Sequence, residues 1–185
     1  MRYRKLCVLG TLFKGDTRFS NSHFMDSANF GNIMTTNKTF SFISLSFDGV
    51  VMFKEAVFRS DHVFFHSIEF NRNVSFNNMK CLKGRFILDT EVKNEIDFSY
   101  AIFKNNLFIV NSISSAKINF HYAVFKCEAN LSLRYCKTVV LSNAVIESTF
   151  DLRWHECQST INELVLINTK NTGQIYLDWE KNSVM

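Results

Sequence analysis

Apolar residues along this chain recur with a period of eleven residues, as two pairs whose members are two residues apart. The pattern is plain in VFFHSIEFNRN at 63–73, IDFSYAIFKNN at 96–106 and INFHYAVFKCE at 118–128. When the places of the repeat are numbered from one to eleven, Phe recurs at places three and eight, and a small or aliphatic residue recurs at places one and six. A spacing of two is the alternation of a β-strand, whose side chains point to opposite faces in turn. Each repeat therefore predicts two short strands.

The same frame extends over most of the chain. It continues through 17–27, 28–38, 40–50, 51–61 and 74–84, with Thr39 and His62 as single inserted residues. Places three and eight are predicted to point into the core, and they hold most of the twenty Phe residues: Phe13, Phe19, Phe24, Phe30, Phe42, Phe47, Phe53, Phe58, Phe65, Phe70, Phe76, Phe98, Phe103, Phe120 and Phe125. Random placement would put only about two-elevenths of them there, so chance does not explain the period.

A repeat of eleven residues is also the period of a right-handed coiled coil, because eleven residues make three turns of α-helix. A helical stripe needs apolar spacings of three and four, whereas the spacing here is two. Stacked strands fit better, since turns about 4.8 Å apart place Phe over Phe and pair the backbone of each turn with the next. If four five-residue faces make one turn, the chain forms about seven turns, a rod on the order of 35 Å long.

The composition agrees with such a stack. The 185 residues include six Gly and no Pro, although tight turns usually use both. Pro is excluded where nearly every N–H donates to a neighbouring strand. No Pro-, Gly- or Ser-rich stretch divides the chain. We expect one domain, with the repeats over residues 1–160 and a degenerate final turn or C-terminal cap over 161–185.

Charge and cysteine content narrow the setting. The 21 basic and 17 acidic residues give a net charge of +4, which is weaker than the basic stripe of a dedicated nucleic-acid-binding protein. The five cysteines are odd in number and widely spaced, which favours a reducing, cytoplasmic location. The apolar stretch at 6–13 is interrupted by Gly10 and Thr11, so we expect no signal peptide. No segment approaches the roughly 20 apolar residues of a membrane-spanning helix.

Five segments resemble the A-[DN]-[LF]-x-x unit of pentapeptide-repeat proteins, in particular a Phe-rich subgroup with eleven-residue spacing. They are Ala28-Asn29-Phe30, Ala56-Val57-Phe58, Ala101-Ile102-Phe103, Ala123-Val124-Phe125 and Ala129-Asn130-Leu131. The resemblance covers roughly residues 6–160. It implies an all-β fold, a right-handed parallel β-helix of quadrilateral cross-section, a bacterial origin in most cases, and no catalysis.

Two segments, 85–95 and 107–117, fit the repeat poorly. Phe86 and Phe108 lie one place too early in them. This indicates a slip of the register or an irregular corner at these positions.

The histidines do not predict a metal site or a catalytic dyad. His66 and His121 share place four but lie 55 residues apart, or two and a half turns, which predicts opposite sides of the rod. His23 and His62 are predicted to be solvated. The compact cluster at 152–157 contains His155 and Cys157, but strand alternation would split it between two faces, so we interpret it as a packed end strand.

Cysteine and carboxylate positions also argue against an enzyme. Cys81, Cys136 and Cys157 fall on place eight and are predicted to be buried thiols. Carbohydrate-cleaving β-helices need paired carboxylates, whereas the acidic residues here are scattered along the corners. We predict no catalytic residue, no metal ion and no cofactor.

One surface feature follows from the geometry. Place nine is basic in several repeats, and with two repeats per turn Lys14, Arg59, Lys104 and Lys126 are predicted to lie along one edge of the rod. Such a ridge can contact an acidic partner, nucleic-acid phosphate or an anionic membrane surface. The alternative is a set of solvated corner residues that keep the rod soluble, and the small net charge favours it.

Three functions remain open at this point. The first is a non-enzymatic scaffold or interaction module that binds another macromolecule, most readily a protein, through its extended faces. The second is a DNA-mimicking protein that protects gyrase, as in one branch of the pentapeptide-repeat family, although that branch is strongly acidic and this chain is basic. The third is a nucleic-acid or membrane-surface binder that uses the basic ridge. A homodimer through an open end of the β-helix is also predicted.

Overall fold

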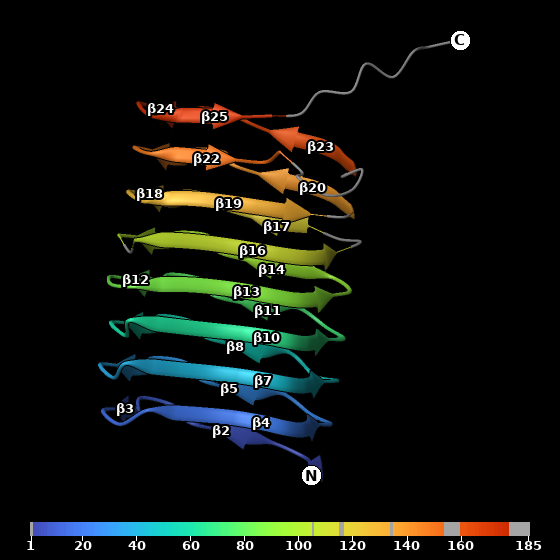
Figure 1. The fold of residues 1–185 in the computed structure, drawn as a ribbon. Helices are drawn as coiled ribbons and strands as arrows, with labels where there is room; N and C mark the ends of the chain where they lie inside the picture. Colours follow the sequence, from blue (N-terminus) through green and yellow to red (C-terminus); the bar gives the residue numbers. More distant parts are fainter. Residues whose placement is uncertain (1, 105, 115–116, 134, 154–159, 178–185) are drawn as a thin grey trace.

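The computed structural model describes residues 2–104, 106–114, 117–133, 135–153 and 160–177. In these residues the chain forms an all-β solenoid of about seven turns, with a spacing of about 23 residues (Figure 1). The predicted parallel β-helix is therefore confirmed, and its right-handedness stays a prediction. Across the same ranges no helix is long and apolar enough to cross a membrane.

Three parallel sheets form the walls, and each turn contributes one strand to each sheet. Sheet A contains β1 (Arg2–Tyr3), β4 (Thr17–Phe24), β7 (Thr39–Phe47), β10 (His62–Phe70), β13 (Arg85–Val92), β16 (Leu107–Ser114), β19 (Glu128–Leu133), β22 (Thr149–Asp151) and β25 (Gln174–Tyr176). Sheet B contains β2 (Leu6–Cys7), β5 (Ala28–Asn29), β8 (Val51–Met52), β11 (Val74–Ser75), β14 (Glu95–Asp97), β17 (Lys117–Asn119), β20 (Tyr135–Val140) and β23 (Thr160–Val165). Sheet C contains β3 (Leu12–Phe13), β6 (Met34–Thr35), β9 (Val57–Phe58), β12 (Lys80–Cys81), β15 (Ile102–Phe103), β18 (Val124–Phe125), β21 (Val145–Ile146) and β24 (Lys170–Asn171). The last strands, β23 to β25, continue all three sheets through the segment predicted as a final turn.

Four five-residue units per turn give three sheets because the long strand of sheet A spans two of the units. In β4, β7 and β10 the boundary between these units is a residue with positive φ: Asn21 at 52°, Ser44 at 53° and Ser67 at 53°. The other two units form the short strands of sheets B and C. The corner between those sheets is another column of positive-φ residues, of which Asn32, Asn78, Asn143 and Asn168 are typical. Asn adopts this conformation more readily than most residues, which is how the chain turns its corners with few glycines.

The poor fit of residues 85–95 has a simple cause. Arg85 pairs with His62, which itself pairs with the other inserted residue, Thr39. Phe86 consequently pairs with Val63, at place one rather than near place three. The register then shifts opposite Ser67, since β13 lacks the extra residue at the bend. The predicted slip is thus real, and it consists of one residue fewer per turn from β13 onward.

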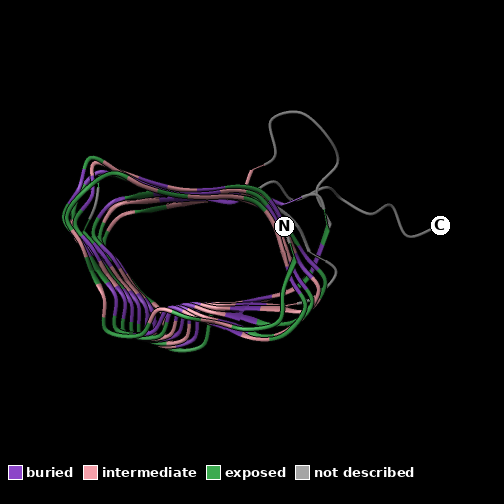
Figure 2. Cartoon of the chain, turned by 90° about the horizontal axis from the view of Figure 1, so that it is seen from below, coloured by how far each residue is buried: buried purple, intermediate pink, exposed green. Residues whose placement is uncertain are grey.

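The core is built from columns of stacked Phe rings. Phe30, Phe53, Phe76, Phe98 and Phe120 follow one another along sheet B, with successive ring centroids 4.8, 5.0, 4.9 and 5.2 Å apart. Shorter columns line the other two walls, and of the Phe residues predicted for the core only Phe13 and Phe19 are partly rather than fully buried. Each offset-stacked pair adds about 0.5–1.5 kcal/mol to the burial of the rings. Viewed along the axis, the turns superpose and the exposed positions gather at the corners (Figure 2).

Phe also changes walls within the core. Where sheet C carries a small residue at place eight, Thr35 or Cys81, the next strand of sheet A supplies Phe40 or Phe86 at place one. Phe40 and Phe86 both pack against Phe58, with ring centroids 6.0 and 5.7 Å away. A large ring from one wall therefore fills the space that the other wall leaves.

One buried hydroxyl in this core is unsatisfied, and its removal is expected to stabilise the protein. The Thr90 hydroxyl points inward from β13 and has no hydrogen-bond partner. We expect Thr90→Val to raise the free energy of unfolding by about 1 kcal/mol, since a buried unpaired hydroxyl costs about that much or more. Urea denaturation followed by circular dichroism measures the change.

A matched substitution serves as the control. Thr35 is buried as well, but its hydroxyl lies 2.7 Å from the Ser60 hydroxyl. Thr35→Val removes that hydrogen bond and should lower stability by about 1 kcal/mol. Equal destabilisation by both substitutions would contradict the assignment of Thr90 as unsatisfied.

Candidate interaction face

The outer surface of sheet C is made of three parallel columns of side chains. Each strand of the sheet lies between a corner residue with positive φ and the residue at place nine, and its first residue points outward. In β15 these are Tyr100, Ile102 and Lys104; in β18 they are Tyr122, Val124 and Lys126. Neighbouring strands repeat the arrangement in register. We call the three columns together the sheet C face.

The place-nine column contains all four residues of the predicted basic ridge. From the N-terminal end it reads Lys14, Thr36, Arg59, Leu82, Lys104, Lys126, Glu147 and Thr172. The four basic residues are exposed, so the register places them on one edge. The column is nevertheless interrupted, and Glu147 forms an ion pair with Lys126 at 2.9 Å.

The middle column is mostly apolar, and the sequence frame gave no reason to single it out. It reads Leu12, Met34, Val57, Lys80, Ile102, Val124, Val145 and Lys170. Leu12 is 47% exposed and Met34 37%, and the remaining apolar members are half-buried. Place seven is the signal that could have revealed this column, because it points outward and yet carries aliphatic residues.

The corner column contains two tyrosines where other turns have Asn or Gly. Tyr100 and Tyr122 have φ of 59° and 57°, a region that bulky residues seldom occupy. Their rings stack at 5.1 Å with an interplanar angle of 14°, and His121 packs edge-on against Tyr122 at 4.4 Å. Both tyrosines are nearly half exposed. Strained, exposed and adjacent aromatic residues of this kind point to a functional contact.

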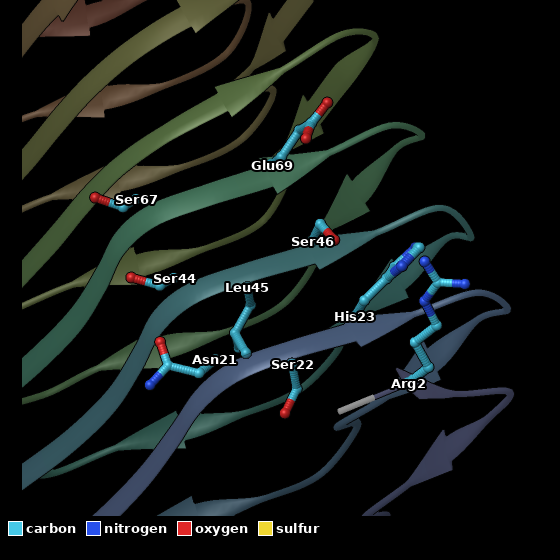
Figure 3. Close-up of a pocket in the computed structure, with 9 residues that line it drawn as sticks. All are labelled: Arg2, Asn21, Ser22, His23, Ser44, Leu45, Ser46, Ser67 and Glu69. Atoms are coloured by element: carbon cyan, nitrogen blue, oxygen red, sulfur yellow. The ribbon is translucent and has the colours of Figure 1, made fainter.

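A second surface feature is a polar groove on sheet A, over the bends of β4, β7 and β10 (Figure 3). Asn21, Ser44 and Ser67 line its floor at the positive-φ positions. Arg2, Ser22, His23, Leu45, Ser46 and Glu69 complete the lining. The groove exists because each of these three strands carries the extra residue that β13 lacks.

A chain of hydrogen bonds runs across turns beside this groove. His23 Nε2 lies 2.7 Å from Asp48 Oδ2, and the Asn71 amide donates to Asp48 Oδ1 at 2.9 Å. Lys93 Nζ donates to Asn71 Oδ1 at 2.6 Å and to Glu69 Oε1 at 2.8 Å. The hydrogen bonds from His23 and Asn71 hold the pKa of Asp48 below its usual value. The hydrogen bond to Glu69 raises the pKa of Lys93.

These groups do not assemble a reactive centre in the described part of the chain. No serine hydroxyl there hydrogen-bonds to His23, as nucleophilic catalysis would need, and no group of three or more His, Cys, Asp or Glu could hold a metal ion. His66 lies on sheet A, 2.7 Å from Asp89, whereas His121 lies at the corner between sheets B and C. The cluster around His155 lies outside the described residues.

The buried cysteines provide a test of the core. Cys81 lies at place eight as predicted, whereas Cys136 is buried in β20 of sheet B, so its predicted place is wrong. Burial raises the pKa of Cys127 to about 12 and of Cys136 to about 11, and it raises the pKa of Cys81 further. Only the thiolate is nucleophilic, so these thiols stay unreactive at mildly alkaline pH.

We expect a thiol reagent such as Ellman's reagent to modify Cys7, which is exposed, rapidly in the folded protein. Cys81, Cys127 and Cys136 should react only after unfolding. The measurement uses a Cys157→Ser background, because Cys157 lies outside the described residues. Modification of Cys81 as fast as Cys7 would be incompatible with the core described above.

Comparisons with known proteins add no assignment: no protein-family model matches the chain, and neither the curated proteins nor the solved structures gave a significant match.

Proposed function

We propose that this chain is a non-enzymatic repeat scaffold that binds another protein through the sheet C face. The observation that carries the proposal is the apolar column held between a column with two stacked tyrosines and a column with four basic residues. Repeat stacks present such extended surfaces because every turn repeats the same outward positions. Tyr and basic side chains around an apolar centre are typical of protein interfaces.

Membership of the pentapeptide-repeat family and a cytoplasmic location belong to the same proposal. The four five-residue units per turn support the first. The free thiols of Cys81, Cys127 and Cys136 support a reducing compartment.

The two other functions predicted from the sequence have less support. A DNA mimic needs a strongly acidic surface, and the sheet C face carries six basic residues (Lys14, Arg59, Lys80, Lys104, Lys126 and Lys170) against two acidic ones (Glu55 and Glu147). A binder of phosphate or anionic lipid needs a continuous basic surface, and here Thr36, Leu82 and Glu147 interrupt the place-nine column. A homodimer through an end of the stack stays a prediction that sedimentation tests.

Site-specific photo-crosslinking tests the proposal. A benzophenone amino acid replaces Val124 on the sheet C face or, as the control, Asn111 on the outer side of sheet A. We expect one protein of the source cell to crosslink at Val124 and not at Asn111. That protein is then purified and titrated against the unmodified chain and against Ile102→Asp.

Ile102→Asp should weaken binding about tenfold or more, as truncation of a central interface residue does. The proposal is wrong if crosslinks form at Asn111 alone, if only nucleic acid or lipid is recovered, or if Ile102→Asp binds the purified protein as tightly as the unmodified chain does.

A further inference from the structure

We propose that the sheet C face binds an acidic amphipathic α-helix of another protein, lying along the axis of the solenoid. This inference rests on the proposed function and names the chemistry of its partner. The apolar column would receive the apolar stripe of the helix. The place-nine column would contact acidic residues along one flank, and the tyrosines would border the other.

The size of the face fits a single helix. Its width runs from a corner residue to place nine, for example Tyr100 to Lys104, which is at most about 13 Å at the rise of an extended chain. Its apolar column runs from Leu12 to Val145 over six steps between neighbouring strands, or about 29 Å. A helix is about 10–12 Å across and rises 1.5 Å per residue, so about 20 residues cover the column.

The spacing along the face also suits a helix. Outward side chains of the apolar column recur every 4.8 Å or so, and the turns of an α-helix recur every 5.4 Å. The difference is small enough for residues at i, i+3, i+4 and i+7 to meet successive members of the column over about three turns. Ile102, Val124 and Val145 form such a run of three neighbouring strands.

A β-strand is a poor occupant of the same face. The backbone groups of sheet C pair with the turns above and below, as in Val124 N to Ala101 O at 2.9 Å and Val145 N to Ala123 O at 2.9 Å. A strand added there would find no free donors or acceptors. A helix needs none, because its own backbone is satisfied internally.

Charge selects an acidic helix. Lys104 and Arg59 are exposed in the place-nine column, and Lys80 interrupts the apolar column. A partner that covers Lys80 has to supply a carboxylate, since a buried charge without a partner is costly. Glu147 at the C-terminal end of the column already pairs with Lys126, so the acidic residues of the helix are expected opposite Lys14, Arg59, Lys80 and Lys104.

Lys80 also argues against the two competing occupants. A second copy packed face to face about a two-fold axis along the stack would place Lys80 against its own counterpart. An anionic bilayer would have to accept the same charge in the middle of the inserted apolar column. A helix avoids both difficulties with one acidic residue.

The test is a selection of displayed random peptides, about 20 residues long to match the face, on the purified chain. Peptides that also bind Ile102→Asp are removed by counter-selection. We expect the enriched sequences to combine apolar residues at i, i+3, i+4 and i+7 with net negative charge. Synthetic versions should gain helical circular dichroism when they bind.

Charge reversal on the chain then checks the orientation. Lys104→Glu is expected to weaken binding of the selected peptides about tenfold or more. Arg72→Glu makes the same change of charge at an exposed corner between sheets A and B, and it should leave the affinity unchanged. Circular dichroism of both variants confirms that they are folded.

Several outcomes would overturn the inference: no enrichment, enriched peptides with alternating strand-like patterns or net positive charge, or equal loss of affinity in Lys104→Glu and Arg72→Glu. Binding to phosphatidylserine vesicles that Ile102→Asp abolishes, or dimerisation that it abolishes, would assign the face to another occupant. If crosslinking at Val124 identifies a protein that binds through an extended or globular surface, the proposed function stands and the helix inference falls.

Discussion

Phe53→Asp is expected to prevent folding altogether. The Phe53 ring is fully buried, stacks on Phe30 at 4.8 Å and on Phe76 at 5.0 Å, and meets Phe42 and Phe65 edge-on. Loss of a buried Phe costs about 3–5 kcal/mol, and an unpaired buried carboxylate adds a penalty of several kcal/mol. Together they approach the total stability of a typical domain, about 5–15 kcal/mol. The variant should be insoluble or lack the circular dichroism of β structure.

The adjacent residue provides the control. Met52 lies on the same strand, β8, but points outward and is half-exposed. Met52→Asp should fold and lose less than about 1 kcal/mol, as surface substitutions usually do. A soluble Phe53→Asp variant that unfolds cooperatively would show that the register of the core is wrong. Phe103→Asp, in the neighbouring wall, is expected to behave as Phe53→Asp does.

Gly84→Ala is expected to be the most destabilising substitution of a glycine for its size. Gly84 has a φ of 71°, and a Cβ atom there would overlap the backbone carbonyl of Asp61 in the turn below. The left-handed conformation costs an alanine about 1–2 kcal/mol, and relief of the overlap requires backbone shifts worth about 1–3 kcal/mol. Thermal and urea denaturation measure the loss.

Two other glycines separate these contributions. Gly10 has a φ of 66° with open space around it, and Gly15 has neither a positive φ nor a close neighbour. Gly10→Ala should therefore show the conformational cost alone, about 1–2 kcal/mol, while Gly15→Ala should be neutral or slightly stabilising. Equal effects at Gly10 and Gly84 would mean that the contact with Asp61 is unimportant.

The fold was predictable because its periodicity is local and repeated. Phe at places three and eight identified the inward positions, and the stack followed from the impossibility of burying one turn alone. The union of two five-residue units into one strand of sheet A was not predictable, since it depends on the backbone conformation of Asn21, Ser44 and Ser67. Nor was the place of Phe86, which only the pairing with Val63 reveals.

The candidate site was predictable in part. Counting by place brought Lys14, Arg59, Lys104 and Lys126 together, because charge at one place of a repeat forms a column. The apolar column escaped the sequence, since Val and Ile at place seven are also what any β-strand favours. The stacking of Tyr100 and Tyr122 escaped it as well, because a corner position shows its strain only in the backbone angle.

The exchange of Phe between walls has an evolutionary consequence. Thr35 with Phe40, and Cys81 with Phe86, fill their layers with one large ring from either side. Selection on such a core acts on the volume of a layer rather than on the identity of any single position, so paired substitutions that move the ring from one wall to the other preserve the packing. Descendants of one ancestral stack can then drift apart position by position while every layer stays full.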